Sequence, residues 1–219
     1  MQPIIFDMDG VLVDSEPLHQ QHLEALFVKI GITEPEKLNH NFKGVNTRDT
    51  SIILIETFNL DYDVDELVKL SRKAYLEHLS SIKELPSIPG AIELVKFLAK
   101  ASHPLALASS ASAKRIELFL TKLGLKQQFK VIASGDDVEH SKPAPDIFLL
   151  AAKKLGVKPS DCIVIEDAEN GVRAAHSAGM KCIAYGGSDH NDDNLLAADL
   201  VVKDFHALVR ALESGGLPV

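Results

Sequence analysis

The chain has 219 residues, of which 46% are hydrophobic and 25% charged, with 13 glycines and 10 prolines. This composition is typical of a soluble globular protein with a sizeable core, so it excludes collagen-like, low-complexity and disordered chains. Lysine and arginine number 23 against 31 aspartate and glutamate residues, a formal net charge of −8, which makes nucleic acid a poor default partner.

Short, continuously apolar runs recur along the chain. Runs of about 4–6 apolar residues without alternation are typical of strands that are covered on both faces, as in parallel sheets. We predict six such strands, at Pro3–Phe6, Pro104–Ala108, Val131–Ala133, Cys162–Ile165, Cys182–Tyr185 and Leu200–Val202.

Helices with recognisable ends alternate with these strands. Ser112 is a predicted N-cap, Pro145 fits a first helical turn, and Gly124 and Gly156 are placed to end helices. The predicted helices are 90–100, 112–123, 146–155, 170–178 and 205–212. This alternation of strands and helices predicts an α/β fold with an open, doubly wound parallel sheet.

The segment between the first two predicted strands is different. It contains roughly seventy residues, far more than a direct βαβ crossover needs, and no convincing strand. Its helical stretches are 19–30, 47–58 and 64–80. We therefore predict a helical subdomain, residues 16–86, inserted after the first strand of a core that comprises residues 1–15 and 87–219.

The sequence lacks the patterns of a membrane protein and of a secreted protein. No apolar stretch of about 18 residues predicts a membrane span, and the N-terminus has no basic leader or cleavage site. We expect a cytoplasmic monomer that contacts no membrane. Cys162 and Cys182 each begin an apolar run without zinc-like spacing, so both are predicted to be buried, reduced thiols.

Polar residues follow the apolar strands at the edge where ligands bind in open parallel sheets. The acids and hydroxyls at strand ends are Asp7, Asp9, Ser109, Ser110, Glu166 and Asp167, and Lys142 precedes a helix that follows another strand. One edge of the predicted sheet therefore gathers four carboxylates, two hydroxyls and a lysine.

Four carboxylates at one edge need an explanation. Like charges raise one another's pKa values and destabilise the fold, whereas a hard divalent cation with oxygen ligands removes the conflict. Few carboxylates with open positions suit Mg²⁺. We predict a Mg²⁺ site with Asp7, Asp9, Asp167 and Glu166 as ligands; for any one of these acids, a helix cap or a solvated side chain is the alternative.

Phosphoryl transfer gives each of these residues a role. Asp7 can attack phosphorus and form an aspartyl phosphate, and Asp9 can protonate the leaving oxygen and then activate water. Ser109 and Ser110 offer hydroxyl and backbone N–H groups to phosphate oxygens. Lys142 supplies positive charge for the transferring group.

Four segments of the chain resemble the motifs of the haloacid dehalogenase superfamily. They are Asp-Met-Asp-Gly-Val-Leu-Val-Asp-Ser from Asp7, Ser109, Lys142 in Ser-Lys-Pro-Ala-Pro-Asp-Ile-Phe, and Glu166-Asp167 with Gly171-Val172. They occur in the family's order and cover nearly the whole chain. The resemblance implies a Rossmann-like core, a helical cap after the first strand, and Mg²⁺.

The resemblance is closest to the β-phosphoglucomutase-like branch, which also contains sugar-phosphate phosphatases. Because the superfamily's dehalogenases lack the second aspartate, Asp9 indicates a phosphatase or phosphomutase. Specificity in this branch is implied to come from the cap, where the candidate substrate-binding residues are His19, Lys43, Gly44 and Arg48.

Two of these cap residues have an alternative interpretation. His19 resembles a mutase histidine that couples cap closure to Asp9, but it can equally be an exposed residue in a first helical turn. Arg48 lies one residue after the position of the mutase arginine, which Thr47 occupies here. This shift favours hydrolysis over the mutase reaction.

We therefore expect a Mg²⁺-dependent phosphatase that hydrolyses a small, sugar-like phosphate monoester through an aspartyl phosphate. One alternative is a β-phosphoglucomutase-type enzyme, whose cap excludes water so that the phosphoryl group passes to sugar. Another is a non-catalytic sensor of a phosphorylated ligand, against which Asp9 counts because a sensor needs no proton-transfer group. A nucleotide-binding protein is disfavoured because no phosphate-binding glycine motif follows a strand.

Overall fold

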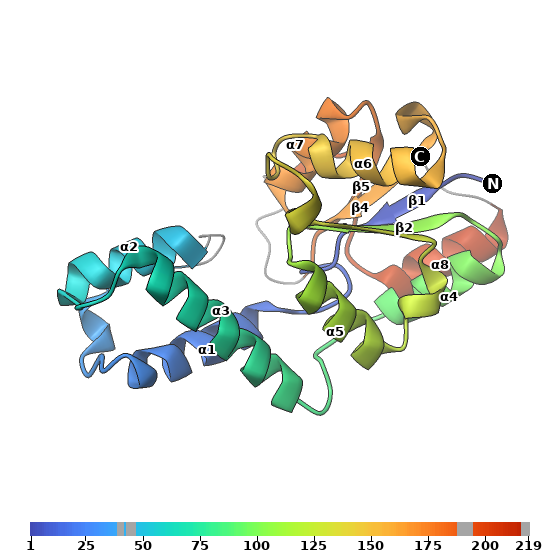
Figure 1. The fold of residues 1–219 in the computed structure, drawn as a ribbon. Coiled ribbons are helices and arrows are strands. Elements are labelled where there is room, and N and C mark those ends of the chain that lie inside the picture. The colour runs from blue at the N-terminus through green and yellow to red at the C-terminus, as the bar shows by residue number, and fades with distance from the viewer. Residues whose placement is uncertain (39–41, 43–46, 188–194, 216–219) are drawn as a thin grey trace. The chain divides into compact units, whose positions relative to one another are not determined.

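The computed structural model describes residues 1–38, 42, 47–187 and 195–215 (Figure 1). These residues form two compact units. The α/β unit comprises Met1–Asp14 and Glu84–Val219, and the helical unit comprises Ser15–Lys83. The chain therefore leaves the α/β unit once and returns to it once.

A six-stranded parallel sheet forms the centre of the α/β unit. Its order is β3-β2-β1-β4-β5-β6, so β1 is paired on both sides, by β2 and β4. The predicted α/β class, the parallel sheet and its six strands are confirmed. The strands are β1 (Ile4–Phe6), β2 (Leu105–Ser109), β3 (Val131–Ser134), β4 (Ile163–Glu166), β5 (Lys181–Tyr185) and β6 (Leu200–Val202).

Helices cover both faces of this sheet (Figure 1). On one face, α6 (Asp146–Leu155) packs on β2 and β3, and α7 (Glu169–Ser177) packs on β4 and β5. The opposite face carries α4 (Ala91–Lys100), α5 (Ala113–Leu123) and α8 (Phe205–Ser214). Coverage on both faces explains why the strands are continuously apolar.

Alternate residues of β1 belong to the two layers of the core. Ile5 lies in the cluster under α6 and α7 together with Phe148 and Val172. Phe6 points to the other layer, where its ring meets that of Phe129 edge to face, with centroids 5.9 Å apart. All of β1 is buried, so the backbone of Asp7, the residue that follows it, is attached to a rigidly packed strand.

Local signals place the helix ends of the α/β unit. The N-cap Ser112 accepts a hydrogen bond from the Arg115 N–H at 3.4 Å, while Gly124 and Gly156 end α5 and α6 in the left-handed region. These predictions are confirmed. Three short 3₁₀ turns, η2 (Lys126–Gln128), η3 (Gly135–Asp137) and η4 (Pro159–Asp161), were not predicted.

The described part of the helical unit contains three α-helices and one 3₁₀ turn. They are α1 (Glu16–Lys29), η1 (Pro35–Lys37), α2 (Thr47–Phe58) and α3 (Val64–Ser81). Leu26, Leu54 and Leu67 bring one residue of each helix into a small core. The first helix begins three residues before its predicted start, because Pro17 occupies its first turn rather than ending the loop.

Both cysteines are buried, free thiols, as predicted. Cys182 lies in β5 and Cys162 immediately precedes β4. Burial raises the pKa of Cys162 to about 11, so this thiol stays protonated at neutral pH. No helix in the described ranges has both the length and the apolar character to cross a membrane.

Candidate active site

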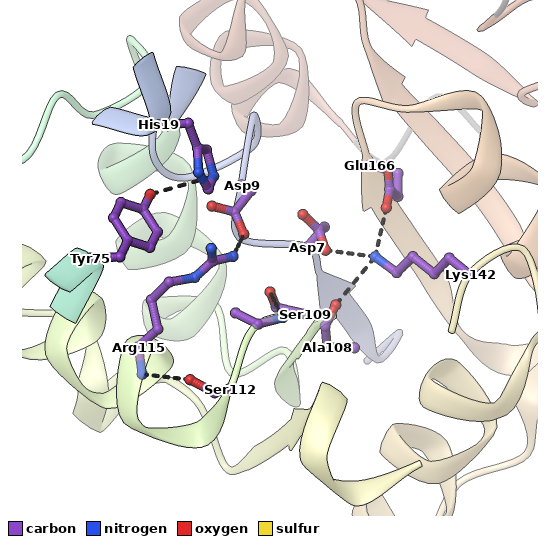
Figure 2. Close-up of polar contacts among 11 residues, drawn as sticks. Asp7, Asp9, His19, Tyr75, Ala108, Ser109, Ser112, Arg115, Lys142 and Glu166 are labelled. Carbon is purple, nitrogen blue, oxygen red and sulfur yellow. Dashed lines mark hydrogen bonds and ion pairs between the residues drawn. The ribbon is translucent and has the colours of Figure 1, made fainter. Parts of the chain in front are cut away.

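The parallel topology brings most of the predicted site residues to one edge of the α/β unit (Figure 2). Asp7 directly follows β1, Ser109 is the last residue of β2, and Glu166 is the last residue of β4. The Asp7 N–H still donates to the Ile165 carbonyl at 2.9 Å, so the strand ladder holds the backbone where the site begins. These three side chains converge because neighbouring parallel strands end at the same edge.

Lys142 lies at the centre of this edge. Its Nζ is 2.6 Å from Oδ1 of Asp7, 2.6 Å from Oε1 of Glu166 and 3.5 Å from the Ala108 carbonyl oxygen (Figure 2). The ring of Phe148 covers it, with Nζ 4.7 Å from the centroid. The lysine side chain is only 9% exposed, so water screens these ion pairs little.

Burial and neighbouring charges both act on these groups. Burial disfavours the charged form of Lys142, but the carboxylates of Asp7 and Glu166 outweigh it and raise the lysine pKa above its usual range. Burial raises the pKa of Asp7 to about 7, against the opposing effect of Lys142. Burial, with the charges of Glu166 and Asp7, also raises the pKa of Asp167 well above its usual range. One lysine therefore does not neutralise the acids at this edge.

Three carboxylates are placed to share one cation. Asp7, Glu166 and Asp167 each offer an oxygen, and these oxygens lie within 4.8 Å of one another. Three carboxylates beside the single ammonium of Lys142 leave two formal negative charges, which a divalent cation balances. An oxygen-only set of acidic ligands, with the pKa values of Asp7 and Asp167 raised by burial and by the neighbouring acids, fits Mg²⁺.

Glu166 and Asp167 are adjacent but are held differently. Glu166 uses Oε1 for Lys142, and its Oε2 accepts hydrogen bonds from the N–H groups of Asp167 and Ala168, both at 2.8 Å. Protein groups thus occupy both oxygens of Glu166, whose side chain is 3% exposed. Glu166 fixes both Lys142 and the turn that carries Asp167.

Two glycines leave room for these carboxylates. Gly10 has a φ of +75°, and a Cβ there would lie 1.9 Å from Oδ2 of Asp167. A Cβ at Gly171, in the first turns of α7, would lie 1.8 Å from Cδ of Glu166. The turn after β1 and the start of α7 can therefore approach the acids only because both residues lack a side chain.

The Asp9 side chain has a different partner from the other acids. Its Oδ2 lies 2.5 Å from Nη2 of Arg115 on α5, and its carboxylate is outside the group of three described acids that could share a cation. The sequence prediction placed Asp9 with those acids. The structure instead directs its side chain toward α5, two residues beyond the end of β1.

The two hydroxyls of the loop after β2 also differ. Ser109 is buried, and its Oγ accepts a hydrogen bond from the Ala111 N–H at 3.1 Å. Ser110 is exposed, and its carbonyl oxygen lies 2.3 Å from where a Cβ at Gly135 would be. The loop is therefore fixed through its backbone and through Ser109.

Two of the four predicted substrate-binding residues of the helical unit lie in described helices. His19, on α1, has its Nε2 3.4 Å from the Tyr75 hydroxyl, with ring centroids 4.8 Å apart. Arg48, on α2, pairs with Asp65 at 2.5 Å, and the two side chains are 59% and 64% exposed. Lys43 and Gly44 lie outside the described residues.

The sequence analysis did not predict a role for Arg115. A signal was available, because Ser112 was identified as the N-cap of the helix that follows the loop after β2. The residue three positions after that cap lies in the first turn, next to the sheet edge. A cation at this position is a candidate partner for an acid at the end of a neighbouring strand.

Comparison with known proteins finds a matching family and similar phosphatases. The family model described as haloacid dehalogenase-like hydrolase matches residues 4–185, from β1 through β5. A phosphorylated carbohydrates phosphatase of Thermotoga maritima is 35% identical over 187 residues, which cover 85% of this chain and 85% of that protein. The fructose-1-phosphate phosphatase YqaB of Escherichia coli is 33% identical over 181 residues, covering 82% of this chain and 94% of that protein.

A similar fold is known from solved structures. A candidate β-phosphoglucomutase from Thermotoga maritima matches with a TM-score of 0.83 at 31% sequence identity. The match covers 98% of this chain and 100% of the other. The similarity therefore includes the inserted helical segment as well as the sheet.

Proposed function

The chain belongs to the haloacid dehalogenase-like hydrolases, and we propose from this membership that it is a Mg²⁺-dependent phosphatase of small, sugar-like phosphate monoesters. The observation that carries the proposal is the buried group in which Lys142 joins Asp7 to Glu166, with Asp167 beside them. A nucleophile, a fixed cation and a cation-binding acidic cluster are the components that phosphoryl transfer needs.

The first chemical step transfers the phosphoryl group to Asp7. A carboxylate oxygen of Asp7 forms a bond to phosphorus while the bond from phosphorus to the leaving alcohol oxygen breaks. The electron pair of that bond stays on the alcohol oxygen, which takes a proton from the Asp9 carboxyl group. The products of this step are the free alcohol, an aspartyl phosphate at Asp7 and ionised Asp9.

The second step returns the enzyme to its starting state. Ionised Asp9 takes a proton from water as the water oxygen attacks phosphorus. The bond between phosphorus and Asp7 breaks, and its electron pair restores the Asp7 carboxylate. One water molecule is consumed, inorganic phosphate is released, and Asp9 is protonated again for the next cycle.

The remaining residues of the edge bind and orient the phosphoryl group. Lys142 and the loop of Ser109 and Ser110 supply a positive charge and hydrogen-bond donors to its oxygens. Asp7 and Asp167 would hold Mg²⁺, whereas Glu166, also predicted as a ligand, is engaged at both oxygens and keeps Lys142 in position. When bound, Mg²⁺ neutralises charge on the phosphoryl oxygens.

The substrate class rests on the relatives. Two of them are named for the phosphatase reaction on phosphorylated carbohydrates and on fructose 1-phosphate. We assign selection of the alcohol to the helical unit, in which the candidate residues remain His19, Lys43, Gly44 and Arg48. The phosphoryl chemistry is assigned to the α/β unit alone.

A phosphomutase of the β-phosphoglucomutase type is the second candidate, because the solved structure with a TM-score of 0.83 is a candidate enzyme of that type. Incubation with β-glucose 1-phosphate and a trace of glucose 1,6-bisphosphate separates the two functions. Glucose 6-phosphate identifies a mutase, whereas glucose and inorganic phosphate identify a phosphatase.

The direct test of the proposed function is phosphate release from a panel of sugar phosphates that includes fructose 1-phosphate, measured with Mg²⁺ and with EDTA. We expect release with Mg²⁺, little release with EDTA and none from Asp7→Asn. A wild-type protein that binds these compounds but releases no phosphate from any of them, or from 4-nitrophenyl phosphate, would instead be a sensor.

A further inference from the structure

We propose that Arg115 is a positioning residue for proton transfer by Asp9. Its guanidinium holds Oδ2 of Asp9, so that Oδ1 is turned to the reacting oxygen. The inference rests on the proposed function, in which Asp9 exchanges the proton. The observation behind it is the 2.5 Å contact between Nη2 of Arg115 and Oδ2 of Asp9, from two residues that are 106 positions apart in the chain (Figure 2).

The backbone that carries Arg115 is fixed at the start of α5. Ser112 caps the helix by accepting a hydrogen bond from the Arg115 N–H itself. The neighbouring Ala113 N–H donates at 2.9 Å to Oδ2 of Asp136, which lies in η3 beyond β3. Because two side chains already cap α5, the contact with Asp9 is not needed to begin the helix.

The guanidinium of Arg115 also lies near an aromatic ring. Its guanidinium carbon lies 6.0 Å from the ring centroid of Phe119, one turn later on α5, and Phe119 is fully buried. The side chain of Arg115 is 17% exposed and that of Asp9 is 27% exposed. A partly covered arginine, with its planar guanidinium, orients a carboxylate better than a mobile surface lysine does.

The two cations of the edge have separate tasks. Lys142 lies against Asp7 and Glu166, whereas Arg115 lies against Asp9. Oδ1 of Asp9 is buried and has no hydrogen-bond partner among the described residues. The arginine therefore occupies one oxygen, and the proposal assigns proton transfer to the other. A planar guanidinium fixes the direction of the Asp9 carboxylate. If the protein also held the second oxygen, that oxygen could not exchange a proton with the substrate.

The leaving group of the substrate tests this assignment. 4-Nitrophenolate is a stable anion that leaves without a proton, whereas the alkoxide of glycerol does not. The value of kcat/KM reports the transfer of the phosphoryl group to Asp7, which is the step in which Asp9 donates its proton. We would measure kcat/KM for β-glycerophosphate and for 4-nitrophenyl phosphate with wild type, Arg115→Met, Arg115→Lys and the control Lys114→Ala, whose exposed side chain is on the same turn.

We expect Arg115→Met to lower kcat/KM for β-glycerophosphate by about tenfold or more, part of the 10²- to 10⁴-fold that a positioned acid–base group contributes. The value for 4-nitrophenyl phosphate should change by less than about twofold, because that leaving group needs no proton. Arg115→Lys, which keeps the charge without the planar fork, should show the same selective loss at smaller size. Lys114→Ala should match wild type on both probes.

Equal losses on the two probes, in a variant whose thermal unfolding midpoint matches wild type, would overturn the inference and leave the proposed function intact. A rise in KM for both probes at constant kcat would also overturn it, because that result identifies a residue that binds substrate. A wild-type protein that releases phosphate from neither probe and from none of the sugar phosphates would refute the proposed function and, with it, this role of Arg115.

Discussion

The ion pairs of the α/β unit and those of the helical unit differ in how much water surrounds them. Lys142 and its partners Asp7 and Glu166 are at most 9% exposed, and one ammonium contacts two carboxylates. Arg48 and Asp65 in the helical unit are 59% and 64% exposed and form a simple pair. The first arrangement is held by the strands and is insensitive to screening, whereas the second is screened by solvent and salt.

This difference indicates how the two units divide the work. Chemistry that moves charge needs groups held in fixed, desolvated positions, and the carboxyl ends of β1, β2 and β4 provide them. Exposed side chains such as Arg48 can change partner at little cost in stability. We infer that relatives with the same α/β unit can differ in substrate through the helical unit.

The largest expected effect is on the chemistry at Asp7. Asp7→Asn removes the nucleophile, so we expect phosphate release to fall by about 10⁴-fold or more. The fold should survive, because the substitution keeps the side-chain shape and removes a charge from a crowded edge. Circular dichroism and thermal unfolding check the fold. Release at more than a few per cent of the wild-type rate would reject Asp7 as the nucleophile.

The next effect compares the two ion pairs directly. Lys142→Met leaves Asp7 and Glu166 buried without their cation, and breaking a buried pair of this kind costs about 3–5 kcal/mol of unfolding free energy. Arg48→Met should change that free energy by about 0–1 kcal/mol, because its pair is exposed. Urea unfolding without Mg²⁺ measures both. Equal effects would contradict the contrast between the units.

A smaller effect on stability is expected at Gly171, which packs against Glu166. Gly171→Ala places a methyl group 1.8 Å from Cδ of Glu166, and such overpacking costs about 1–3 kcal/mol. Because Glu166 holds Lys142, activity should fall as well. The matched substitution in the helical unit is Gly31→Ala, which meets no atom within 4 Å and carries only the strain of its φ of +79°. Unchanged activity in Gly171→Ala would show that Glu166 tolerates displacement.

The last expected effect is an opposite pH dependence of stability in the two units. Asp7 has a folded pKa of about 7 against 3.8 unfolded, so its contribution is fully present below pH 3.8 and is lost as pH rises through 7. His22 on α1 has a pKa lowered by burial from 6.5 to about 4, so its contribution is present above pH 6.5 and is lost as pH falls through 4.

Thermal unfolding in EDTA across this pH range tests both signs. Relative to wild type, Asp7→Asn should gain stability as pH rises toward 8, and His22→Gln should gain stability as pH falls toward 4. His22→Gln also loses the 3.1 Å hydrogen bond between His22 and Ser71, which lowers its stability across the pH range, so the sign is read from the change with pH. Parallel curves for a variant and wild type would mean that its residue does not titrate differently in the folded protein.

Residues whose position depends on the strand ladder could be predicted from the sequence. The apolar runs located all six strands, and the rule for parallel sheets then placed Asp7, Ser109 and Glu166 at one edge. The N-cap Ser112 and the helix-ending glycines were predictable because each follows from a local backbone preference.

Contacts between distant segments could not be predicted in the same way. The Ser112 cap places Arg115 in the first turn of α5, but its pairing with Asp9 depends on the exact rotation of that helix, which no local pattern specifies. Strand spacing likewise indicated Lys142 as a phosphate ligand but gave no reason to expect one ammonium between two carboxylates. The orientation of Arg48 depends on an exposed side chain whose partner, Asp65, lies on another helix.

Chemical trapping of the phosphorylated residue tests the central claim most directly. Wild-type protein is mixed with Mg²⁺ and a sugar phosphate that it hydrolyses, and the reaction is quenched within the first turnover. Borohydride then reduces an aspartyl phosphate to homoserine. Peptide mass spectrometry should then find homoserine at position 7, dependent on substrate. Turnover with homoserine absent at position 7, or present at another acid, would contradict this account.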